Sequence, residues 1–303
     1  MSRARERALL AQAPEALPPV FIVGLHRSGT TFLYEVLRDL LPLSCVTAFR
    51  VLRYPELLSL AADHRLPGAR QELAQRFHAW GLGDRQIDAV ALRPDMPEEY
   101  GWILAHARGR LTLGPRTEGV FGELCRKLAV LEPGHTPLLK NPWDTAQVPW
   151  IAARLPRARF VFIDRDPLRV LQSQLGAAVV NAGYAPYLDL LLARFRLGRA
   201  ALAGQRLLLA TLGRERFRRV MLRGLARDVV AQRAHFARAA DAVEPTRQAT
   251  VRYEDLIQDP ARALEPVLEL LELPLRAPLA SVAPRPRQRP LDPLVETQAW
   301  RFR

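Results

Sequence analysis

Short apolar runs alternate with longer amphipathic stretches along most of the chain. Residues 18–24 (PPVFIVG), 136–140 (TPLLK) and 159–164 (RFVFID) have the length and composition of buried strands. Each precedes a stretch with helical spacing of apolar residues: TFLYEVLRDLL, NPWDTAQVPWIAARL and RDPLRVLQSQLGAAVV. A fourth run, 249–256 (ATVRYEDL), predicts a last strand that leads into a short helix. The alternation predicts an α/β fold with a central parallel sheet, right-handed crossovers and helices on both faces.

Two long segments interrupt this alternation and have helical patterns of their own. The first covers about 54–131 and contains the breaker-rich stretch LRPDMPEEY, and the second covers about 184–242 and is rich in arginine. After 273 the chain contains too much proline for regular structure to be expected. We therefore predict one domain over 1–303, with a core at about 19–273, two helical insertions and a Pro/Arg-rich C-terminal segment at 274–303.

Length and composition are those of a globular protein. The chain has 303 residues, of which 49% are hydrophobic, and this is enough for a large core. It contains no run of eighteen apolar residues, and its first residues lack the continuous apolar segment of a secretory signal. These features predict a cytoplasmic protein with no transmembrane segment. The two cysteines, Cys45 and Cys125, lie far apart and indicate neither a disulfide framework nor a zinc site.

The formal charge of +13 raises the possibility of a nucleic-acid or membrane partner. However, the arginines of the second insertion recur at helical spacing, with few aromatic residues that could stack on bases. This distribution favours a solvated helical face over a specific nucleic-acid surface.

The stretch GLHRSGTT (24–31) has the spacing of a phosphate-binding loop, G-x-x-x-x-G-K-[ST], with Thr30 where the lysine is expected. A predicted strand precedes the loop and a predicted helix follows it, so backbone N–H groups and the helix dipole would converge on one anion. In nucleotidases the lysine reaches the β- and γ-phosphates, so a ligand with no γ-phosphate would not require it. The alternative is a turn that only caps a helix.

A second anion site is indicated by FIDRDPLRVLQS (162–173). Arg165 follows the strand, Pro167 suits the first helical position, and Ser173 lies about two turns into the helix. A guanidinium and a hydroxyl would then converge on a second phosphate. Arg165 could instead pair with Asp164 or Asp166 at the surface.

GLHRSGTT, LLKNPW, FIDRDPLRVLQS and RYEDLIQDP, in this order, resemble the sulfotransferases that use 3′-phosphoadenosine 5′-phosphosulfate (PAPS), most closely the bacterial ones. The resemblance runs from about Pro19 to Leu273 and implies a P-loop nucleotidase-like fold. It implies that the 5′ end of the donor is held by Arg27, Ser28, Gly29, Thr30 and Thr31, and the 3′-phosphate by Arg165 and Ser173. Tyr253 of the RYEDL motif would lie near the nucleotide, unless it only packs under the last strand.

The same resemblance gives Lys140 a role in catalysis. Lys127 and Lys140 are the only lysines in the chain. At the end of its strand Lys140 would reach the phosphosulfate bridge and stabilise charge on the departing oxygen. The alternative is a surface lysine in an ordinary ion pair.

The general base is harder to assign from the sequence. The region CVTAFRVLRYPE offers no acid before Glu56, where some members of the family have their base. RPDMPEEYGW resembles an acidic stretch of bacterial members, which makes Glu98 the first candidate and Glu99 the second. Both also suit the first turn of any helix. His26 would contact the phosphosulfate or the acceptor, or only fill the loop.

The leading hypothesis is transfer of a sulfonate group from PAPS to a hydroxyl or amine by in-line displacement, with no metal. A magnesium-dependent kinase or nucleotidase with Asp164 as metal ligand is a second reading, and a non-catalytic nucleotide- or membrane-binding protein is a third. The sequence leaves open whether the acceptor is a small molecule, a lipid, a carbohydrate or a peptide, and it does not predict the oligomeric state.

Overall fold

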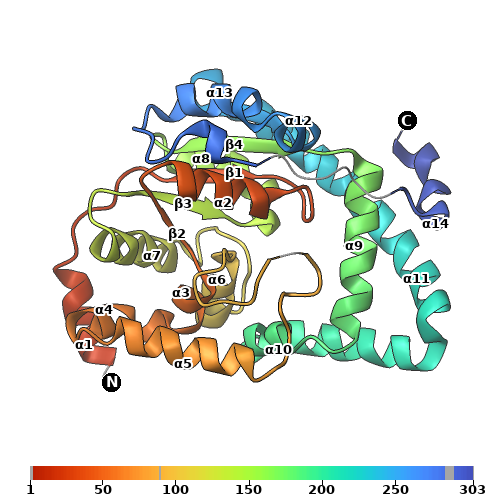
Figure 1. Ribbon diagram of the computed structural model, residues 1–303, viewed down its shortest axis with the longest axis horizontal. Coiled ribbons are helices and arrows are strands. Elements are labelled where there is room, and N and C mark those ends of the chain that lie inside the picture. Colours follow the sequence, from red (N-terminus) through yellow and green to blue (C-terminus); the bar gives the residue numbers. More distant parts are fainter. Residues whose placement is uncertain (1–2, 89, 284–289, 303) are drawn as a thin grey trace.

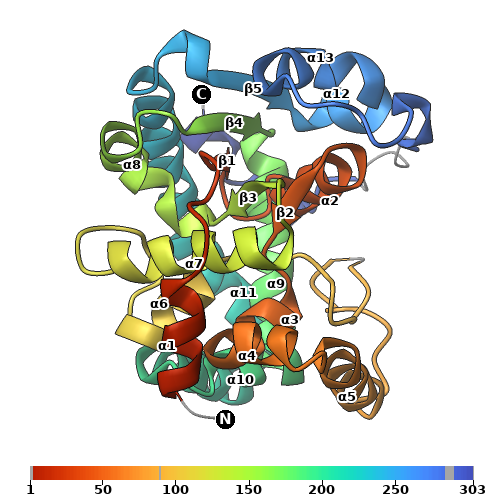
Figure 2. The ribbon, with the colours of Figure 1, turned by 90° about the vertical axis from the view of Figure 1, so that its left-hand side faces the viewer.

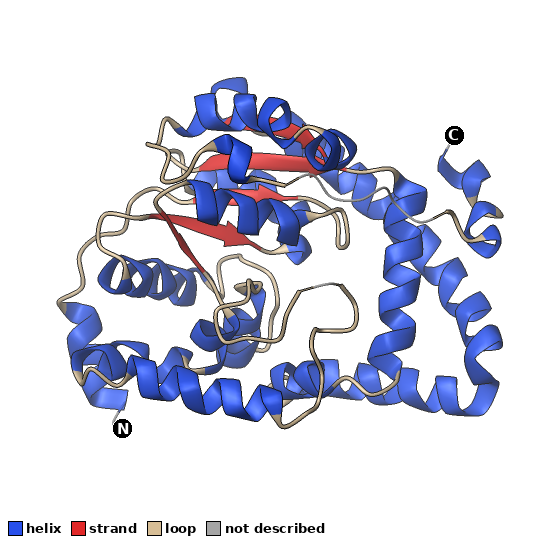
Figure 3. Cartoon of the chain, in the orientation of Figure 1, coloured by secondary structure: helices blue, strands red, loops and turns tan. Residues whose placement is uncertain are grey.

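A five-stranded parallel sheet forms the centre of the molecule (Figures 1 and 3). The computed structural model describes residues 3–88, 90–283 and 290–302. The strands have the order β2-β3-β1-β4-β5, and every neighbouring pair is parallel. Their bounds are β1 Val20–Val23, β2 Leu43–Cys45, β3 Thr136–Lys140, β4 Arg159–Asp164 and β5 Gln248–Arg252. All five carboxyl ends therefore meet at one edge of the sheet, where parallel α/β folds bind their ligands.

Helices cover both faces of the sheet, as predicted (Figure 2). Val20 and Ile22 of β1 point to one face and pack with α2 (Thr30–Leu40), α12 (Tyr253–Gln258) and α13 (Pro260–Leu271). Phe21 and Val23 point to the other face, because side chains alternate along a strand. The helices on that face include α3 (Ala48–Leu52), α6 (Gly101–Arg108), α7 (Glu118–Leu131) and α8 (Val148–Arg154). Burial on both faces explains the continuous apolar strands.

The first insertion is helical, as expected. It contains η1 (Tyr54–Glu56), α4 (Leu57–Ala62), α5 (Leu66–His78), α6 and α7. The N-terminal helix α1 (Arg3–Ala11) is fastened to it by Glu6, whose carboxylate accepts hydrogen bonds from the backbone N–H of Leu58 and Ser59. The buried Nζ of Lys127 lies 2.5 Å from Glu6 Oε1. One of the two lysines thus has a structural partner.

The second insertion lies on the side of the molecule next to the carboxyl ends of the strands. From that edge α9 (Pro167–Ala182) runs down to α10 (Pro186–Leu192), and the chain continues in α11 (Arg196–Asp241) (Figure 1). Gly213 bends α11 sharply, with a φ of 71° and a ψ of 167°. The second insertion is therefore helical, with α10 followed by a bent α11. After the bend, Leu222, Ala226 and Val229 pack on the apolar side of α9.

The C-terminal segment contains more regular structure than its proline content predicts. After η4 (Leu279–Ser281), the chain forms α14 (Pro293–Glu296) and η5 (Ala299–Phe302), while 284–289 lie outside the described residues. Asp292 caps α14, and Val295 is buried against α9 and α11. The prediction of no regular structure after 273 is wrong here, because a capped single turn needs only one buried anchor. Two further 3₁₀ turns are η2 (Pro142–Gln147) and η3 (Pro245–Arg247).

Within the described part of the chain, no single helix combines the length and apolar composition needed to cross a bilayer. By those two criteria alone the bent pair α9 and α10, with 84° between the two helices, would pass.

Candidate active site

Four of the predicted motifs lie at the carboxyl ends of neighbouring strands. The loop 24–31 follows β1, Lys140 ends β3, Arg165 follows β4, and Tyr253 follows β5. The stretch that contains Glu98 lies next to the carboxyl end of β2. Its Glu98 N donates a hydrogen bond to the carbonyl of Val46, the residue that follows β2. The sheet therefore brings together motifs that are more than two hundred residues apart in the sequence.

The loop after β1 is shaped to present its backbone to a ligand. Leu25 O accepts hydrogen bonds from both the backbone N–H and the hydroxyl of Ser28, which turns the chain. Gly29 has a φ of 102°, and α2 begins at Thr30 without a side-chain cap. A Cβ at Gly29 would lie 2.2 Å from the ring of Tyr253, so only glycine fits between the loop and α12. The uncapped start of α2 is a favourable place for an anion.

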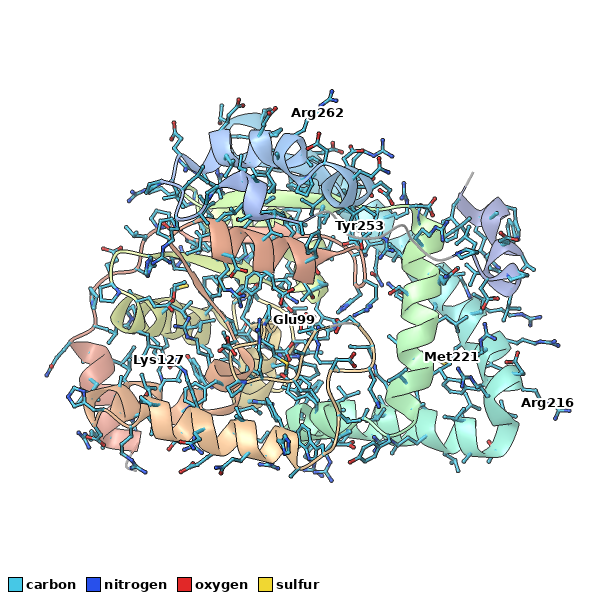
Figure 4. All side chains as sticks on the ribbon, in the orientation of Figure 1. Glu99, Lys127, Arg216, Met221, Tyr253 and Arg262 are labelled. Atoms are coloured by element: carbon cyan, nitrogen blue, oxygen red, sulfur yellow. The ribbon has the colours of Figure 1, made fainter. Side chains whose placement is uncertain are left out.

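A cavity of about 490 Å³ lies against this loop. Ten of the twelve predicted site residues line it: His26, Arg27, Gly29, Thr30, Thr31, Glu98, Glu99, Arg165, Ser173 and Tyr253. The other two, Ser28 and Lys140, are buried. Figure 4 shows Glu99 in the interior below the sheet and Tyr253 at the end of the sheet near α9.

Arg165 and Ser173 face the cavity, and Arg27 joins them. Arg165 Nη1 donates to Arg27 O at 2.8 Å, and the guanidinium of Arg165 lies 4.2 Å from the centre of the Tyr253 ring. Arg27 Nε donates to Ser173 Oγ at 3.1 Å, so the Arg27 side chain extends from the loop to α9. Two guanidinium groups and a hydroxyl thus belong to residues that line the same cavity.

The acidic residues around Arg165 have other partners. Asp166 caps α9 by accepting hydrogen bonds from the N–H groups of Leu168 and Arg169. Asp164 lies 4.0 Å from Arg233. Both aspartates therefore have described partners other than Arg165.

Lys140 is fully buried and is not a surface lysine. Its Nζ lies 2.6 Å from Glu99 Oε1 and 3.0 Å from Thr31 Oγ1. The ring of Tyr34 lies 5.8 Å away on another side. The ammonium group therefore connects the phosphate loop with the acidic stretch.

Glu98 and Glu99 have different environments although they are adjacent. Glu98 is buried, accepts a hydrogen bond from the Tyr187 hydroxyl and lies 3.5 Å from Arg85. Burial raises the pKa of Glu98 well above its usual range. Burial also opposes ionisation of Glu99, but the ammonium of Lys140 outweighs it and holds the pKa of Glu99 below its usual range. The pKa values of the two adjacent carboxyl groups are therefore shifted in opposite directions, upward for Glu98 and downward for Glu99.

His26 lies at the rim of the loop among aromatic rings. Its ring packs edge-on against Trp143 with centroids 4.7 Å apart, and Trp143 packs against Trp102 at 5.2 Å. The Nε2 atom of His26 is buried without a hydrogen-bond partner. Burial lowers the pKa of His26 to about 4, so its imidazole is neutral at physiological pH.

Comparison with known proteins identifies the family. A profile described as the sulfotransferase family matches residues 18–277. The chain belongs to the sulfotransferase family. Comparison with curated protein sequences found no significant match.

Two solved sulfotransferases share the fold at low sequence identity. STF9 from Mycobacterium avium is 16% identical with a TM-score of 0.60, over 98% of this chain and 70% of that one. STF1 from Mycobacterium tuberculosis H37Rv is 17% identical with a TM-score of 0.57, over 98% of this chain and 79% of that one. The fold is thus the P-loop nucleotidase-like fold of sulfotransferases, as predicted, and the family supports sulfotransferase activity in general.

Several cavity residues carry no recognisable signal in the sequence. Arg85 and Asp88 come from the loop between α5 and α6, and Tyr187 comes from α10. Trp143 does lie within LLKNPW, but its position there does not predict contact with His26. Arg85, Asp88 and Tyr187 reach the cavity through the two insertions, whose packing the strand and helix pattern does not determine.

The rest of the cavity wall is mainly apolar. Trp102, Trp143 and the α11 residue Met221 contribute to it, and Figure 4 shows Met221 between α9 and α11. Further apolar residues on this wall are Leu82, Val90, Leu92, Ala177, Ala178, Leu188, Leu191 and Leu225. Among the described residues, no group of three or more His, Cys, Asp or Glu is placed to hold a metal ion.

Proposed function

We propose that the protein transfers a sulfonate group from PAPS to a hydroxyl or amine of a small organic acceptor by in-line displacement. The observation that carries the proposal is the pairing of two anion subsites across β1 and β4. The first is the loop with the uncapped start of α2, and the second contains Arg165, Ser173 and Arg27. A nucleotide with phosphates on both its 5′ and 3′ positions matches two such subsites, whereas ATP has no 3′-phosphate.

In this proposal the loop 27–31 holds the 5′ end of the donor. Backbone N–H groups and the hydroxyls of Thr30 and Thr31 surround the phosphosulfate, and the dipole of α2 favours its negative charge. Arg165 and Ser173 hold the 3′-phosphate. Tyr253, which packs on both Gly29 and Arg165, lies beside the nucleotide.

Lys140 stabilises the leaving group. In sulfonate transfer a bond forms between the acceptor oxygen or nitrogen and sulfur, while the bond from sulfur to the bridging phosphate oxygen breaks and leaves its electron pair on that oxygen. A cation beside the bridging oxygen stabilises this charge more in the transition state than in the ground state. Lys140 reaches Thr31 of the donor loop and is therefore well placed for this role.

Glu99 is a better candidate for the general base than Glu98. Glu99 lines the cavity beside Lys140, whose ammonium group lowers its pKa, whereas burial raises the pKa of Glu98, which is engaged with Tyr187. The proton of the acceptor moves to the Glu99 carboxylate. When the Lys140 ammonium turns toward the bridging oxygen, Glu99 loses its ion-pair partner and its proton affinity rises. This coupling would strengthen the base as the leaving group departs.

The magnesium-dependent alternative lacks a metal ligand in the right place. It requires Asp164 beside the phosphates, but the side chain of Asp164 is 45% exposed and lies closest to Arg233 among its described ion pairs. Asp164 also does not line the cavity. No observation on the described residues favours a non-catalytic nucleotide- or membrane-binding protein over an enzyme.

The apolar wall supports an uncharged organic acceptor with a single reacting group. Trp102, Trp143 and the leucines of α10 offer dispersion contacts and few hydrogen-bond partners. Asn181, Gln205 and Gln232 line the same cavity and add hydrogen-bonding groups, so the lining suits an organic acceptor with an apolar body and some polar groups.

Thermal unfolding with adenosine 3′,5′-bisphosphate (PAP), AMP and ATP tests the donor assignment. Ligand at 100 times its Kd stabilises a protein by about 2.7 kcal/mol, which raises the Tm of a domain of this size by a few degrees. We expect this shift with PAP, a much smaller one with AMP, and loss of most of the PAP shift in Arg165→Ala. Arg262→Ala is the matched control, because Arg262 lies on the outer surface of α13 (Figure 4). Equal shifts with PAP and AMP would contradict the proposal.

A further inference from the structure

A carboxylate of the protein itself occupies the second anion subsite. Asp88 Oδ2 lies 3.1 Å from Arg27 Nη1, on the same guanidinium whose Nε donates to Ser173. The neighbouring carbonyl of Ile87 accepts from Arg27 Nη2 at 2.6 Å. Asp88 and Ile87 therefore accept hydrogen bonds from Nη1 and Nη2 of Arg27. These are the two nitrogens with which the guanidinium would otherwise bind a charged ligand.

The segment that carries Asp88 has backbone bonds of its own. Arg85 N donates to Val90 O at 3.1 Å and Leu92 N donates to Gly83 O at 3.2 Å, and an antiparallel bridge joins Asp84 with Ala91. These bonds join residues 83–85 to residues 90–92 without help from Arg27. The contact with Arg27 is thus an addition to the loop and not the bond that forms it.

The charges around Asp88 favour exchange for a phosphate. Asp88 brings one negative charge to Arg27 and Arg85, with Arg85 Nη2 at 2.6 Å from its carboxylate. Arg85 has a second acidic neighbour in Glu98 at 3.5 Å, and it lines the same cavity. A phosphate monoester carries nearly two negative charges and three acceptor oxygens, so it satisfies the Arg27 guanidinium better than one carboxylate does.

From this geometry we propose that Asp88 occupies the position of the donor's 3′-phosphate on Arg27 and is displaced when the donor binds. The proposal rests on the proposed function, and it assigns Arg27 to the 3′-phosphate subsite in addition to the loop. Asp88 is then an internal competitor that weakens the binding of every nucleotide whose phosphate must reach Arg27. It sets the concentration of PAPS, and of the product PAP, at which the site fills.

Calorimetric titration of PAP into three forms of the protein tests the proposal. In Asp88→Asn we expect the Kd for PAP to fall about three- to tenfold, because a neutral amide competes weakly for Arg27. The matched control is Asp84→Asn: Asp84 lies on the same loop and lines the same cavity, but among its described contacts it accepts only from Gln86 N. Asp84→Asn removes the same charge as Asp88→Asn, and the Kd of this control variant for PAP should stay within about twofold of wild type.

Two comparisons distinguish direct competition between Asp88 and the 3′-phosphate from a general effect of the lost charge on nucleotide binding. The tightening in Asp88→Asn should be larger for PAP than for AMP, because AMP has no 3′-phosphate to place on Arg27. In an Arg27→Met background, Asp88→Asn should no longer change the Kd for PAP. Asp88→Ser repeats the measurement with a shorter side chain, and circular dichroism checks the folding of each variant.

An unchanged Kd in Asp88→Asn would overturn the proposal. A weaker Kd would also overturn it and would mean that Asp88 stays in place to orient Arg27. Equal tightening for PAP and AMP, or tightening that persists without Arg27, would contradict direct exchange. Failure of the wild-type protein to bind PAP at all would instead remove the donor assignment itself, so the two failures are distinguishable.

Discussion

The Nζ atom of Lys140 lies 2.6 Å from Glu99 Oε1, and both groups are withdrawn from solvent at the end of β3. The pair connects the residues proposed to stabilise the leaving group with those proposed to activate the acceptor. Lys140 also reaches Thr31 of the donor loop, and Glu99 lines the acceptor cavity. A change to either partner should therefore affect transfer more than nucleotide binding.

Replacing Lys140 by methionine should lower kcat at least about 100-fold, because charge on the departing oxygen loses its buried cation. The Kd for PAP should change less than about fivefold, since the loop and the second subsite remain. Steady-state kinetics and calorimetry measure the two quantities. Lys140→Met leaves Glu99 buried without its cation, so the double variant with Glu99→Gln controls for misfolding. An activity loss that only follows a loss of PAP binding would contradict a role in the transition state.

Glu99→Gln should lower kcat by about 100-fold or more, whereas Glu98→Gln should lower it by less than about tenfold. Glutamine keeps the shape of each side chain and a partner for Lys140 or Tyr187, but it cannot accept the acceptor's proton. Initial rates with saturating donor give the comparison. The opposite order of the two effects would make Glu98 the base.

Gly29→Ala should destabilise the protein by about 2 kcal/mol or more and reduce the thermal shift with PAP. The left-handed backbone alone costs about 1–2 kcal/mol for a residue with a Cβ. The added methyl group would also lie 2.2 Å from Tyr253, which would push that ring from the nucleotide site. Gly68→Ala is the control, because a Cβ there meets no atom within 4 Å. Wild-type stability and PAP binding in Gly29→Ala would refute the close packing of the loop against Tyr253.

His26 should make the protein less stable in mild acid. The folded protein holds its pKa at about 4, against an ordinary value of 6.5, so the unfolded chain binds more protons between these two pH values. The stability from the neutral imidazole is complete above pH 6.5 and is lost as the pH falls toward 4, by at most about 3 kcal/mol. Chemical denaturation of wild type and His26→Gln at several pH values measures it. A stability difference between the two proteins that does not change with pH would contradict this pKa.

The strands that carry the motifs could be predicted closely. TPLLK and RFVFID are β3 and β4 with the predicted bounds, because each is an uninterrupted apolar run between clear breakers. The start of α2 at Thr30 was also predictable, since the glycine loop forces the chain from strand to helix. The three residues of β2, in contrast, follow α2 almost directly, and LSC is too short to show a strand period.

The arrangement within the site was less predictable than its location. The sequence indicates that Arg165 and Ser173 share a subsite, and their spacing along β4 and α9 explains why. It does not show that Arg27 turns away from its own loop to reach Ser173, since that depends on Asp88 from an insertion. Likewise, adjacent Glu98 and Glu99 look equivalent in the sequence. Only the folded structure separates them, because burial raises the pKa of Glu98 and the Lys140 ammonium lowers that of Glu99.

The ion pair between Glu6 and Lys127 has a practical consequence for anyone who shortens this chain. The family match begins at residue 18, so a fragment cut to the matched segment would omit α1. The ammonium of Lys127 would then lose its counter-ion, and the first turn of α4 would lose its acceptor. The folding unit therefore starts earlier than the region that sequence comparison recognises, and an expression fragment should retain α1.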